Sequence, residues 1–440
     1  MSNKLLIPAQ ALVLGVALSA ACLPAAADAV SDAKLDELQR KLDQSMKMIE
    51  ALTARVKDLE THPISPTVAA APAPADAQRI DAVEQKVAQI ETANATRTSD
   101  DAGLPIHGFA DVGLGNRNPY FAYFEGANIG SLDLYLTPKL GDSIVSLAEL
   151  IFEVGADGHV GTDLERFQIG YQFSDKATVW VGRFHTPYGY VNTALHHGVW
   201  LADALRRPKF ANFEDHGGVM PAHTVGVWTT GAQRAGEGKF LYDFYVGNGQ
   251  HIEDGIVDMQ NGGTQHAAAM AGTRLSYQFS GGPADGLLVG VNGFTDKVSS
   301  NTTLNVTRLN MVGAYASYDT DDWEHIVEAY SFYDKNLNGA PVTHRSNAWF
   351  AQFAYRAHWG IPYVRYERAS LDQTDEYFAE QIFGASYYRS ALGVRFDFNA
   401  KASVKFEVAH TRTTDFRPVD LTVGLPEEYN EVLAQYAVRF

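Results

Sequence analysis

The chain ends with the sequence EVLAQYAVRF, residues 431–440, in which apolar and polar side chains alternate. The apolar positions are Val432, Ala434, Tyr436, Val438 and Phe440, and the polar positions between them include Glu431, Gln435 and Arg439. Successive side chains of a β-strand point to opposite faces, so this period of two residues predicts a strand with one apolar and one polar face. The strand at residues 431–440 is therefore expected to contact an apolar environment with one face and a polar environment with the other.

The same period of two residues extends upstream from the C-terminus to about residue 106. The clearest further runs are residues 132–136, 167–173, 242–246, 349–355 and 392–398. We expect the strands around these runs to be about nine to twelve residues long, which is the length of a tilted strand that spans a membrane.

The connections between the expected strands alternate between long and short. The long ones lie near residues 115–130, 155–163, 185–221, 247–265, 295–307, 333–345, 370–384 and 412–428, and the short ones include KLGD, SDK, SGGPAD and DTDD. Membrane barrels have short turns at one end, longer loops at the other and an even number of strands. The pattern predicts an all-β fold, an antiparallel transmembrane β-barrel of about 16 strands over residues 105–440.

Composition excludes several other classes of protein. A single cysteine rules out a disulfide scaffold and a thiolate metal site, and the net charge of -17 argues against nucleic acid as a partner. Aromatic residues make up 11% of the chain, while the mean hydropathy of -0.18 is too low for a bundle of membrane helices. A barrel with a polar interior and aromatic residues at the membrane interfaces accounts for both values.

The N-terminal residues 1–29 are typical of a signal peptide. Lys4 precedes an apolar stretch that ends in small residues around 27–29. A retained membrane anchor is the alternative, but Pro8 and Pro24 interrupt the stretch. Cys22 is one residue out of register for a lipoprotein signal.

Two helical segments are expected between the signal peptide and the barrel. Residues 30–60 show apolar positions at alternating spacings of three and four, as in a short coiled coil, which requires partner chains to be stable. Residues 61–78 hold four prolines and form an extended linker, and residues 79–104 contain a second short helix and a further linker.

This organisation resembles that of trimeric outer-membrane porins with an N-terminal periplasmic coiled coil. The terminal Phe440, with apolar residues at every second position before it, resembles the signal read by the outer-membrane assembly machinery. The resemblance implies a bacterial outer-membrane location, a homotrimer, contact with lipid and lipopolysaccharide, no cofactor, and residues 185–221 as the constriction loop L3. Phosphate-selective porins of the O/P type are the nearest subfamily, although the inward positions here carry arginine where those porins have lysine.

Parity along the strands places charged side chains toward the lumen, since arginine or lysine facing lipid at mid-membrane costs about 2–4 kcal/mol. The pore-lining candidates are Arg356, Arg365, Arg389, Arg395, Arg274, Glu149, Glu153 and Asp243. The first four lie on three successive strands and most acids lie on early strands, which favours a transverse field that attracts anions. The alternative is a set of structural ion pairs, such as Arg365 with Glu367 and Arg395 with Asp397.

Residues 185–221 hold the densest set of chemically active side chains. Asp203, Arg206, Arg207, Lys209, Glu214 and Asp215 are the candidates that narrow and polarise the constriction. His185, His196, His197 and His216 lack the spacing of a metal site on one helix, so we expect hydrogen-bonded loop histidines and no metal. The aromatic residues of the loop are expected to pack it against the wall.

The sequence therefore predicts an outer-membrane porin, a water-filled channel for passive diffusion of small hydrophilic solutes, anions among them. The alternative function is a structural one, in which the coiled coil tethers the membrane to the cell wall. Deletion of residues 30–100 distinguishes the two functions, because conductance survives it only in a channel. An enzyme is not expected, since no G-x-S-x-G motif occurs and small lipase barrels have fewer strands.

Overall fold

A computed structural model describes most of the chain from residue 106 onward. The described ranges are 106–116, 126–138, 140–154, 159–196, 200–213, 217–258, 270–414 and 428–440. The expected signal peptide, coiled coil, linker and second helix lie outside the described residues. None of the described helices is long and apolar enough to cross a membrane.

The described part of the chain forms one antiparallel β-barrel. Its wall strands are β1 (Ile106–Gly115), β2 (Gly126–Leu136), β3 (Ile144–Val154), β4 (Val160–Ser174), β5 (Ala177–His185), β6 (His223–Ala235), β7 (Gly238–Gly247), β10 (Met270–Gln278), β11 (Leu287–Ser300), β12 (Val306–Asp319), β13 (Trp323–Asn336), β14 (Thr343–Tyr355), β15 (Ile361–Ser370), β16 (Tyr387–Asn399), β17 (Ala402–Thr413) and β18 (Glu428–Arg439). The described sheet has 18 strands, and β8 (His251–Glu253) and β9 (Ile256–Val257) form a hairpin within one connection, so the wall has the predicted sixteen.

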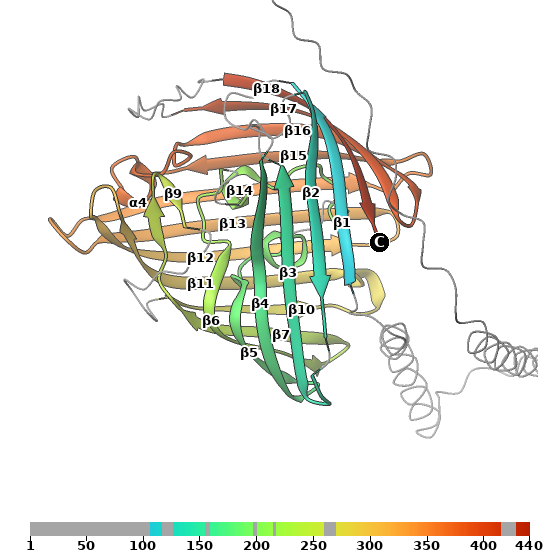
Figure 1. Cartoon of the computed structure of the whole chain (residues 1–440), viewed down its shortest axis with the longest axis horizontal. Coiled ribbons are helices and arrows are strands. Elements are labelled where there is room, and N and C mark those ends of the chain that lie inside the picture. Colours follow the sequence, from blue (N-terminus) through green and yellow to red (C-terminus); the bar gives the residue numbers. More distant parts are fainter. Residues whose placement is uncertain are drawn as a thin grey trace, which may run out of the picture. The chain divides into compact units, whose positions relative to one another are not determined.

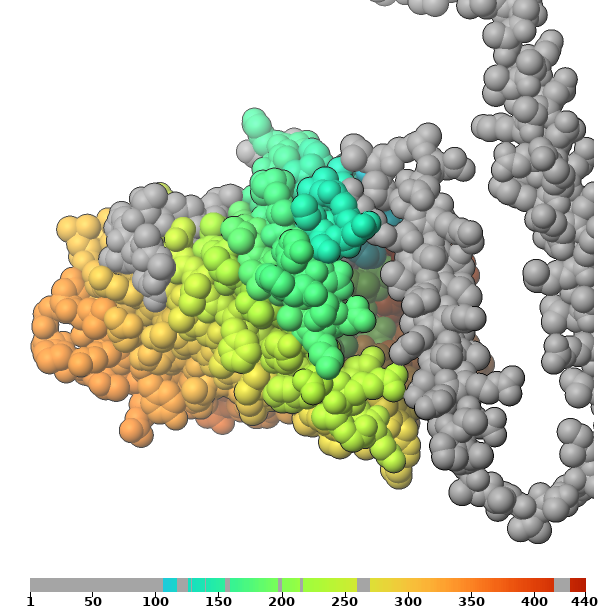
Figure 2. All heavy atoms as spheres, turned by 90° about the horizontal axis from the view of Figure 1, so that it is seen from below, coloured from blue at the N-terminus to red at the C-terminus, as the bar shows by residue number. Residues whose placement is uncertain are grey.

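Each wall strand pairs with the next along the chain, and β1 pairs with β18 to close the barrel (Figure 1). In the space-filling view of Figure 2, green segments lie beside yellow-green ones and yellow beside orange, as expected when strands follow one another in chain order. Among the described residues, the short helices lie in connections between strands: α3 (Val191–Ala194), η2 (Lys209–Ala211), η4 (Gly282–Ala284) and α4 (Glu376–Ala379). Full closure leaves no unpaired strand edge in the wall.

Burial alternates along the strands as the sequence predicts. On β13, Glu324, Ile326, Glu328 and Tyr330 are buried, whereas Val327 between them is 40% exposed. The outer surface carries many other exposed apolar side chains, among them Phe244, Leu392, Val364 and Phe406. The outside of the barrel is therefore apolar, while charged and polar groups are buried inside it.

Several strands are longer than predicted. β4 has 15 residues and β11, β12 and β13 have 14 each, so the expected loops 295–307 and 333–345 shrink to residues 301–305 and 337–342. The inward side chains there are polar, such as the fully buried Asp296 and Asp334, and outward positions such as Lys335 are polar too. Because both faces of these strand ends are polar, they lack the alternation of apolar and polar residues from which the other parts of the strands were predicted.

Phe440 lies at the seam where the first and last strands of the barrel, β1 and β18, pair. Its backbone N–H donates to the Gly108 carbonyl at 3.0 Å, and the Gly108 N–H donates to the Phe440 carbonyl at 3.1 Å. The Phe440 ring covers Gly108 so closely that a Cβ at this glycine would lie 2.4 Å from ring carbon Cζ. The ring is also 51% exposed on the apolar outer face.

Deleting Phe440 is expected to lower the amount of barrel that reaches the outer membrane without changing the pore. The terminal ring belongs to the outer face and to the first-to-last strand seam, so its loss affects assembly and not the interior. The amount of the protein in membrane fractions measures assembly, and the conductance of the channels that do assemble measures the pore. Phe440→Tyr is the control, because it keeps an aromatic ring at the last position. Normal abundance of the shortened chain would contradict the prediction.

Candidate functional site

The connection between β5 and β6, residues 186–222, folds into the barrel and is called L3 from here on. Its side chains Tyr188 and Phe210 are each 1% exposed and belong to the same apolar cluster as inward-facing residues of the wall. The Tyr188 ring meets the Tyr330 ring edge-on at 6.0 Å, and the Phe210 ring meets the same tyrosine at 5.7 Å. Apolar packing thus places L3 against β13 and its neighbours.

Glu328 on β13 holds the first turn of L3. Its Oε1 accepts hydrogen bonds from the N–H groups of Tyr190 at 2.6 Å and Val191 at 2.8 Å, and its Oε2 accepts from the Tyr330 hydroxyl at 2.5 Å. Gly189 precedes this turn with a φ of +57°, and a Cβ there would lie 2.2 Å from the Tyr330 hydroxyl oxygen. Close approach and backbone conformation both require glycine at this position.

Arg274 and Asp243, two of the pore-lining candidates, brace the same turn. They are direct cross-strand partners on β10 and β7, and the Arg274 Nη2 lies 2.7 Å from Asp243 Oδ2. The Arg274 Nη1 then donates to Thr193 Oγ1 at 2.6 Å. The Asp243 charge is therefore paired, and its partner arginine contacts L3.

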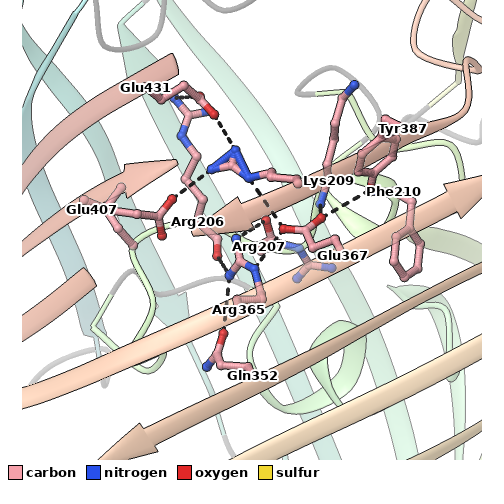
Figure 3. Close-up of polar contacts among 12 residues, drawn as sticks. Arg206, Arg207, Lys209, Phe210, Gln352, Arg365, Glu367, Tyr387, Glu407 and Glu431 are labelled. Atoms are coloured by element: carbon pink, nitrogen blue, oxygen red, sulfur yellow. Dashed lines mark hydrogen bonds and ion pairs between the residues drawn. The ribbon is translucent and has the colours of Figure 1, made fainter. Parts of the chain in front are cut away.

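Arg365 and Glu367 on β15 hold the middle of L3 (Figure 3). The Arg365 guanidinium donates to the carbonyl oxygens of Arg206 at 2.5 Å and Arg207 at 3.2 Å, and its Nε donates to Glu367 Oε1 at 2.9 Å. The Glu367 Oε2 accepts from the Lys209 backbone N–H at 2.6 Å. Since Arg365 is only 2% exposed, its donors are directed to the loop backbone.

Arg389 on β16 is surrounded by glutamates from three strands. Its guanidinium contacts Glu407 at 2.9 Å, Glu367 at 3.6 Å and Glu431 through a direct hydrogen bond. Glu431 also lies 3.8 Å from the Arg206 guanidinium of L3. The transverse field expected from the sequence is consequently weaker on this side, because acids are interleaved with the arginines.

Arg395 and Lys405 hold the segment of L3 that begins at Trp200. The Arg395 Nη1 donates to the Trp200 carbonyl at 2.6 Å and the Ala202 carbonyl at 3.1 Å, and its Nε donates to Asp397 at 2.8 Å. The Lys405 ammonium donates to the same Ala202 carbonyl at 2.6 Å. Arg395 also stacks its guanidinium over the Trp200 ring, 4.7 Å from the ring centre.

Arg356 follows β14 and is the most accessible of the four predicted arginines, with 29% of its side chain exposed. Its guanidinium lies 3.8 Å from both Asp203 of L3 and Glu324, and 2.6 Å from Asp319. Burial raises the pKa of Asp203, and the nearby arginines Arg395 and Arg356 oppose this rise. Asp203 thus lies between two arginines of the wall, Arg356 at 3.8 Å and Arg395 at 3.5 Å.

Three cationic side chains of L3 itself are half-buried, namely Arg206, Arg207 and Lys209. Arg207 braces the loop internally, since its Nη2 donates to Asn192 Oδ1 at 2.8 Å and to the Ala211 carbonyl at 2.7 Å. The Lys209 ammonium lies 4.5 Å from the centre of the Tyr387 ring. Burial and the neighbouring Arg389 lower the pKa of Lys209 to about 8. Burial likewise lowers the pKa of Arg206.

The remaining candidates lie on the early strands or outside the described residues. Glu149 on β3 forms a hydrogen-bonded ion pair with Arg166 on β4. Glu153 on β3 is half-buried and faces Ser131 across the β2–β3 ladder. Glu214 and Asp215, with His197 and His216, fall outside the described part of L3.

The structure brings together both ion pairs of the structural alternative, Arg365 with Glu367 and Arg395 with Asp397. It adds a feature that sequence reasoning missed, the hydrogen bonds from Arg365, Arg395 and Lys405 to backbone carbonyls of L3. Every residue has a backbone carbonyl whatever its type, so no sequence signal could have identified these acceptors.

Solved structures share this fold. The anion-selective porin from Comamonas acidovorans matches with a TM-score of 0.53 at 14% identity, over 77% of this chain and 99% of that one. The outer membrane channel DcaP of Acinetobacter baumannii matches with a TM-score of 0.50 at 10% identity, over 77% and 97%. No protein-family model and no curated protein sequence matches the chain. The barrel thus has the fold of bacterial outer-membrane porins.

Proposed function

We propose that the chain is an outer-membrane porin, a water-filled channel through which small hydrophilic solutes, preferably anions, diffuse passively. One observation carries the proposal: a closed sixteen-strand barrel whose fifth connection folds inside and carries Arg206, Arg207 and Lys209 at half-buried positions. A loop held within a barrel narrows its cross-section, and the charges on the loop then act on any solute that passes.

The cationic loop residues favour anions despite the net charge of -17. Charges in outer loops are screened beyond about 8 Å at physiological ionic strength, so groups at the constriction outweigh the sum over the chain. Arginine binds a carboxylate through two parallel hydrogen bonds, which lysine cannot do. Phosphate accepts the same pair of hydrogen bonds, so small carboxylates and phosphate are both candidate solutes.

The proposal extends to the assembly. A homotrimer in the bacterial outer membrane, delivered by the outer-membrane assembly machinery and embedded in lipid and lipopolysaccharide, accounts for the exposed apolar outer face and for the heptads at residues 30–60. The coiled coil then lies in the periplasm. The absence of enzymatic activity stays a prediction.

The direct test is single-channel recording of the purified full-length chain in planar bilayers, with reversal potentials measured in a salt gradient. We expect ohmic conductance and a reversal potential on the anion-selective side. Liposome swelling then compares small carboxylates with neutral sugars of equal size. Absence of conductance from the folded protein would reject the channel, and cation preference would reject the anionic solute alone.

Raising the pH from 7 to 9 is expected to reduce the anion preference. With its pKa lowered to about 8, Lys209 is mostly charged at pH 7 and mostly neutral at pH 9. The charged groups around it are Arg389, which lowers its pKa, and Glu367 and Glu431, which raise it. Loss of one charge at close range is worth about 1 kcal/mol, or about fivefold in the permeability ratio.

Two variants assign this pH dependence to Lys209. Lys209→Arg should keep the neutral-pH selectivity up to pH 9, whereas Lys209→Met should show the alkaline value already at pH 7. Reversal potentials at both pH values measure the effect. The assignment to Lys209 is wrong if Lys209→Met keeps the wild-type pH dependence.

A further inference from the structure

Three buried histidines converge where L3 leaves and re-enters the wall. His185 is the last residue of β5, His223 is the first residue of β6, and the two are direct cross-strand partners. His196 follows the helical turn α3 of L3. Each histidine offers a ring nitrogen, and these three nitrogens lie within 4.8 Å of one another. The side chains are 8%, 2% and 4% exposed for His185, His223 and His196.

The best-defined pair already has nearly the separation that a metal ion requires. The Nε2 atoms of His196 and His223 are 3.0 Å apart. Two nitrogens bound to one tetrahedral zinc ion, each about 2.0–2.1 Å from it, are about 3.3 Å apart. The His185 ring stacks on the His196 ring, with their centres 3.3 Å apart, so the His185 ring must turn before its nitrogen points at the same ion.

The backbone fixes the protonation of His196. Its Nδ1 lies 3.0 Å from the Asn192 carbonyl oxygen, which can only accept a hydrogen bond. The Nδ1 therefore carries the proton, and Nε2 presents its lone pair to the cluster in the neutral ring. A carbonyl on the second nitrogen is the usual way in which proteins orient a metal-binding histidine.

A carboxylate completes the set. Glu165 Oε2 lies 2.7 Å from His223 Nε2, and the Glu165 side chain is nearly buried. The β3–β4 ladder shifts register at Glu149 and Leu150, so that Glu165 is left opposite no residue of β3. Bulges of this kind redirect side chains near functional sites.

Hydrogen bonds alone explain the cluster less well than a cation does. His223 Nε2 lies within 3.0 Å of two groups that present lone pairs, Glu165 Oε2 and His196 Nε2, yet it carries at most one hydrogen. A cation among these atoms would be attracted to all of them at once. A second carboxylate, Glu149, lies 3.6 Å from His185 Nε2 and is itself paired with Arg166.

We propose that His185, His196, His223 and Glu165 form a binding site for a divalent transition-metal ion of the zinc class. Imidazole ligands select zinc, copper, nickel or iron, whereas calcium and magnesium require oxygen ligands. Three histidines and a carboxylate fill a tetrahedral shell, and their burial is typical of a structural site. Such an ion joins both ends of L3 to its first helical turn. The proposal of this metal site does not depend on which solute the channel transports.

The test is zinc binding by the full-length chain, purified in detergent without a histidine tag and stripped with a chelator. We expect one Zn²⁺ per chain by elemental analysis after dialysis, and a visible spectrum typical of tetrahedral coordination when Co²⁺ replaces it. His196→Ala should weaken Zn²⁺ binding at least about tenfold in isothermal titration. His410→Ala is the matched control, since the His410 side chain is 41% exposed and lies on β17.

Heat-modifiable migration on gels verifies that each variant is folded. If His196→Ala fails this check, Glu165→Gln, which keeps the size of the wall side chain, takes its place. The proposal is overturned if the folded wild-type chain retains no Zn²⁺, or if the cluster variant binds Zn²⁺ as tightly as wild type. Equal loss of Zn²⁺ in His410→Ala would also overturn it, because binding would then lie elsewhere.

Discussion

Replacing Arg365 and Arg395 together with methionine is expected to release residues 200–207 of L3 from the barrel wall and to raise single-channel conductance several-fold. The two guanidinium groups donate to four backbone carbonyls of this segment, those of Trp200, Ala202, Arg206 and Arg207. Methionine keeps much of the side-chain length but donates no hydrogen bond, so these contacts are lost without opening a large cavity.

The energetic cost is large enough to change the position of the loop. A hydrogen bond that involves a charged group contributes about 1.5–3 kcal/mol, and removing one partner of a buried ion pair costs about 3–5 kcal/mol. Loss of Arg365 leaves Glu367 with Arg389 at 3.6 Å as its cationic partner. Several kcal/mol of docking energy therefore disappear from one segment of L3.

The measurement is conductance and current noise of single channels, with Arg412→Met as the control. Arg412 is an exposed arginine on β17, so its replacement removes one positive charge away from L3. Unchanged conductance in the double variant would mean that the apolar contacts of Tyr188 and Phe210 hold the loop without the arginines.

The sequence predicted the barrel and the place of L3 because both depend on local patterns. A period of two residues and the alternation of loop lengths are properties of neighbouring residues, and they identified the strand around residues 392–398 and the long connection at 185–221. The extended ends of β11 and β13 were missed because their outward positions are polar, so the apolar alternation stops before the strand does.

The contacts within the site depend on the three-dimensional path of L3, which no local pattern encodes. Arg365 contacts the Arg206 carbonyl across a separation of 159 residues. His223 was not grouped with His185 and His196 because it begins the next strand and lies outside the expected loop. Side-chain parity could place a residue inside the barrel, but it could not show which inward groups meet.

The geometry also changes how the arginines should be tested. Replacing Arg356, Arg365, Arg389 and Arg395 by glutamine together should shift the reversal potential toward cations, as the sequence predicts. However, the same change removes two anchors of L3 and leaves the glutamates around Arg389 unbalanced. A single substitution that leaves L3 in place separates the charge effect from the loop effect.

Arg356→Gln is that substitution, and it should shift the channel toward cation preference with its conductance nearly unchanged. Arg356 donates to a carboxylate and a carbonyl at the β12–β13 turn, and its guanidinium lies 3.8 Å from Asp203 and Glu324. Without it, two carboxylates at the edge of L3 lose a nearby positive charge. At effective dielectric constants between those of protein and water, one charge within about 8 Å is worth about 1 kcal/mol, or about fivefold in permeability ratio.

Reversal potentials in a salt gradient measure this shift, and two further variants interpret it. Arg308→Gln removes the same charge from an exposed position on β12 and should leave selectivity as in wild type. Adding Asp203→Asn to Arg356→Gln should restore part of the anion preference, because it removes the negative charge of a carboxylate that lies 3.8 Å from the lost guanidinium and 3.5 Å from Arg395. A reversal potential that does not move in Arg356→Gln would mean that this arginine only balances Asp203 and Glu324, and that passing solutes respond to Arg206 and Lys209 instead.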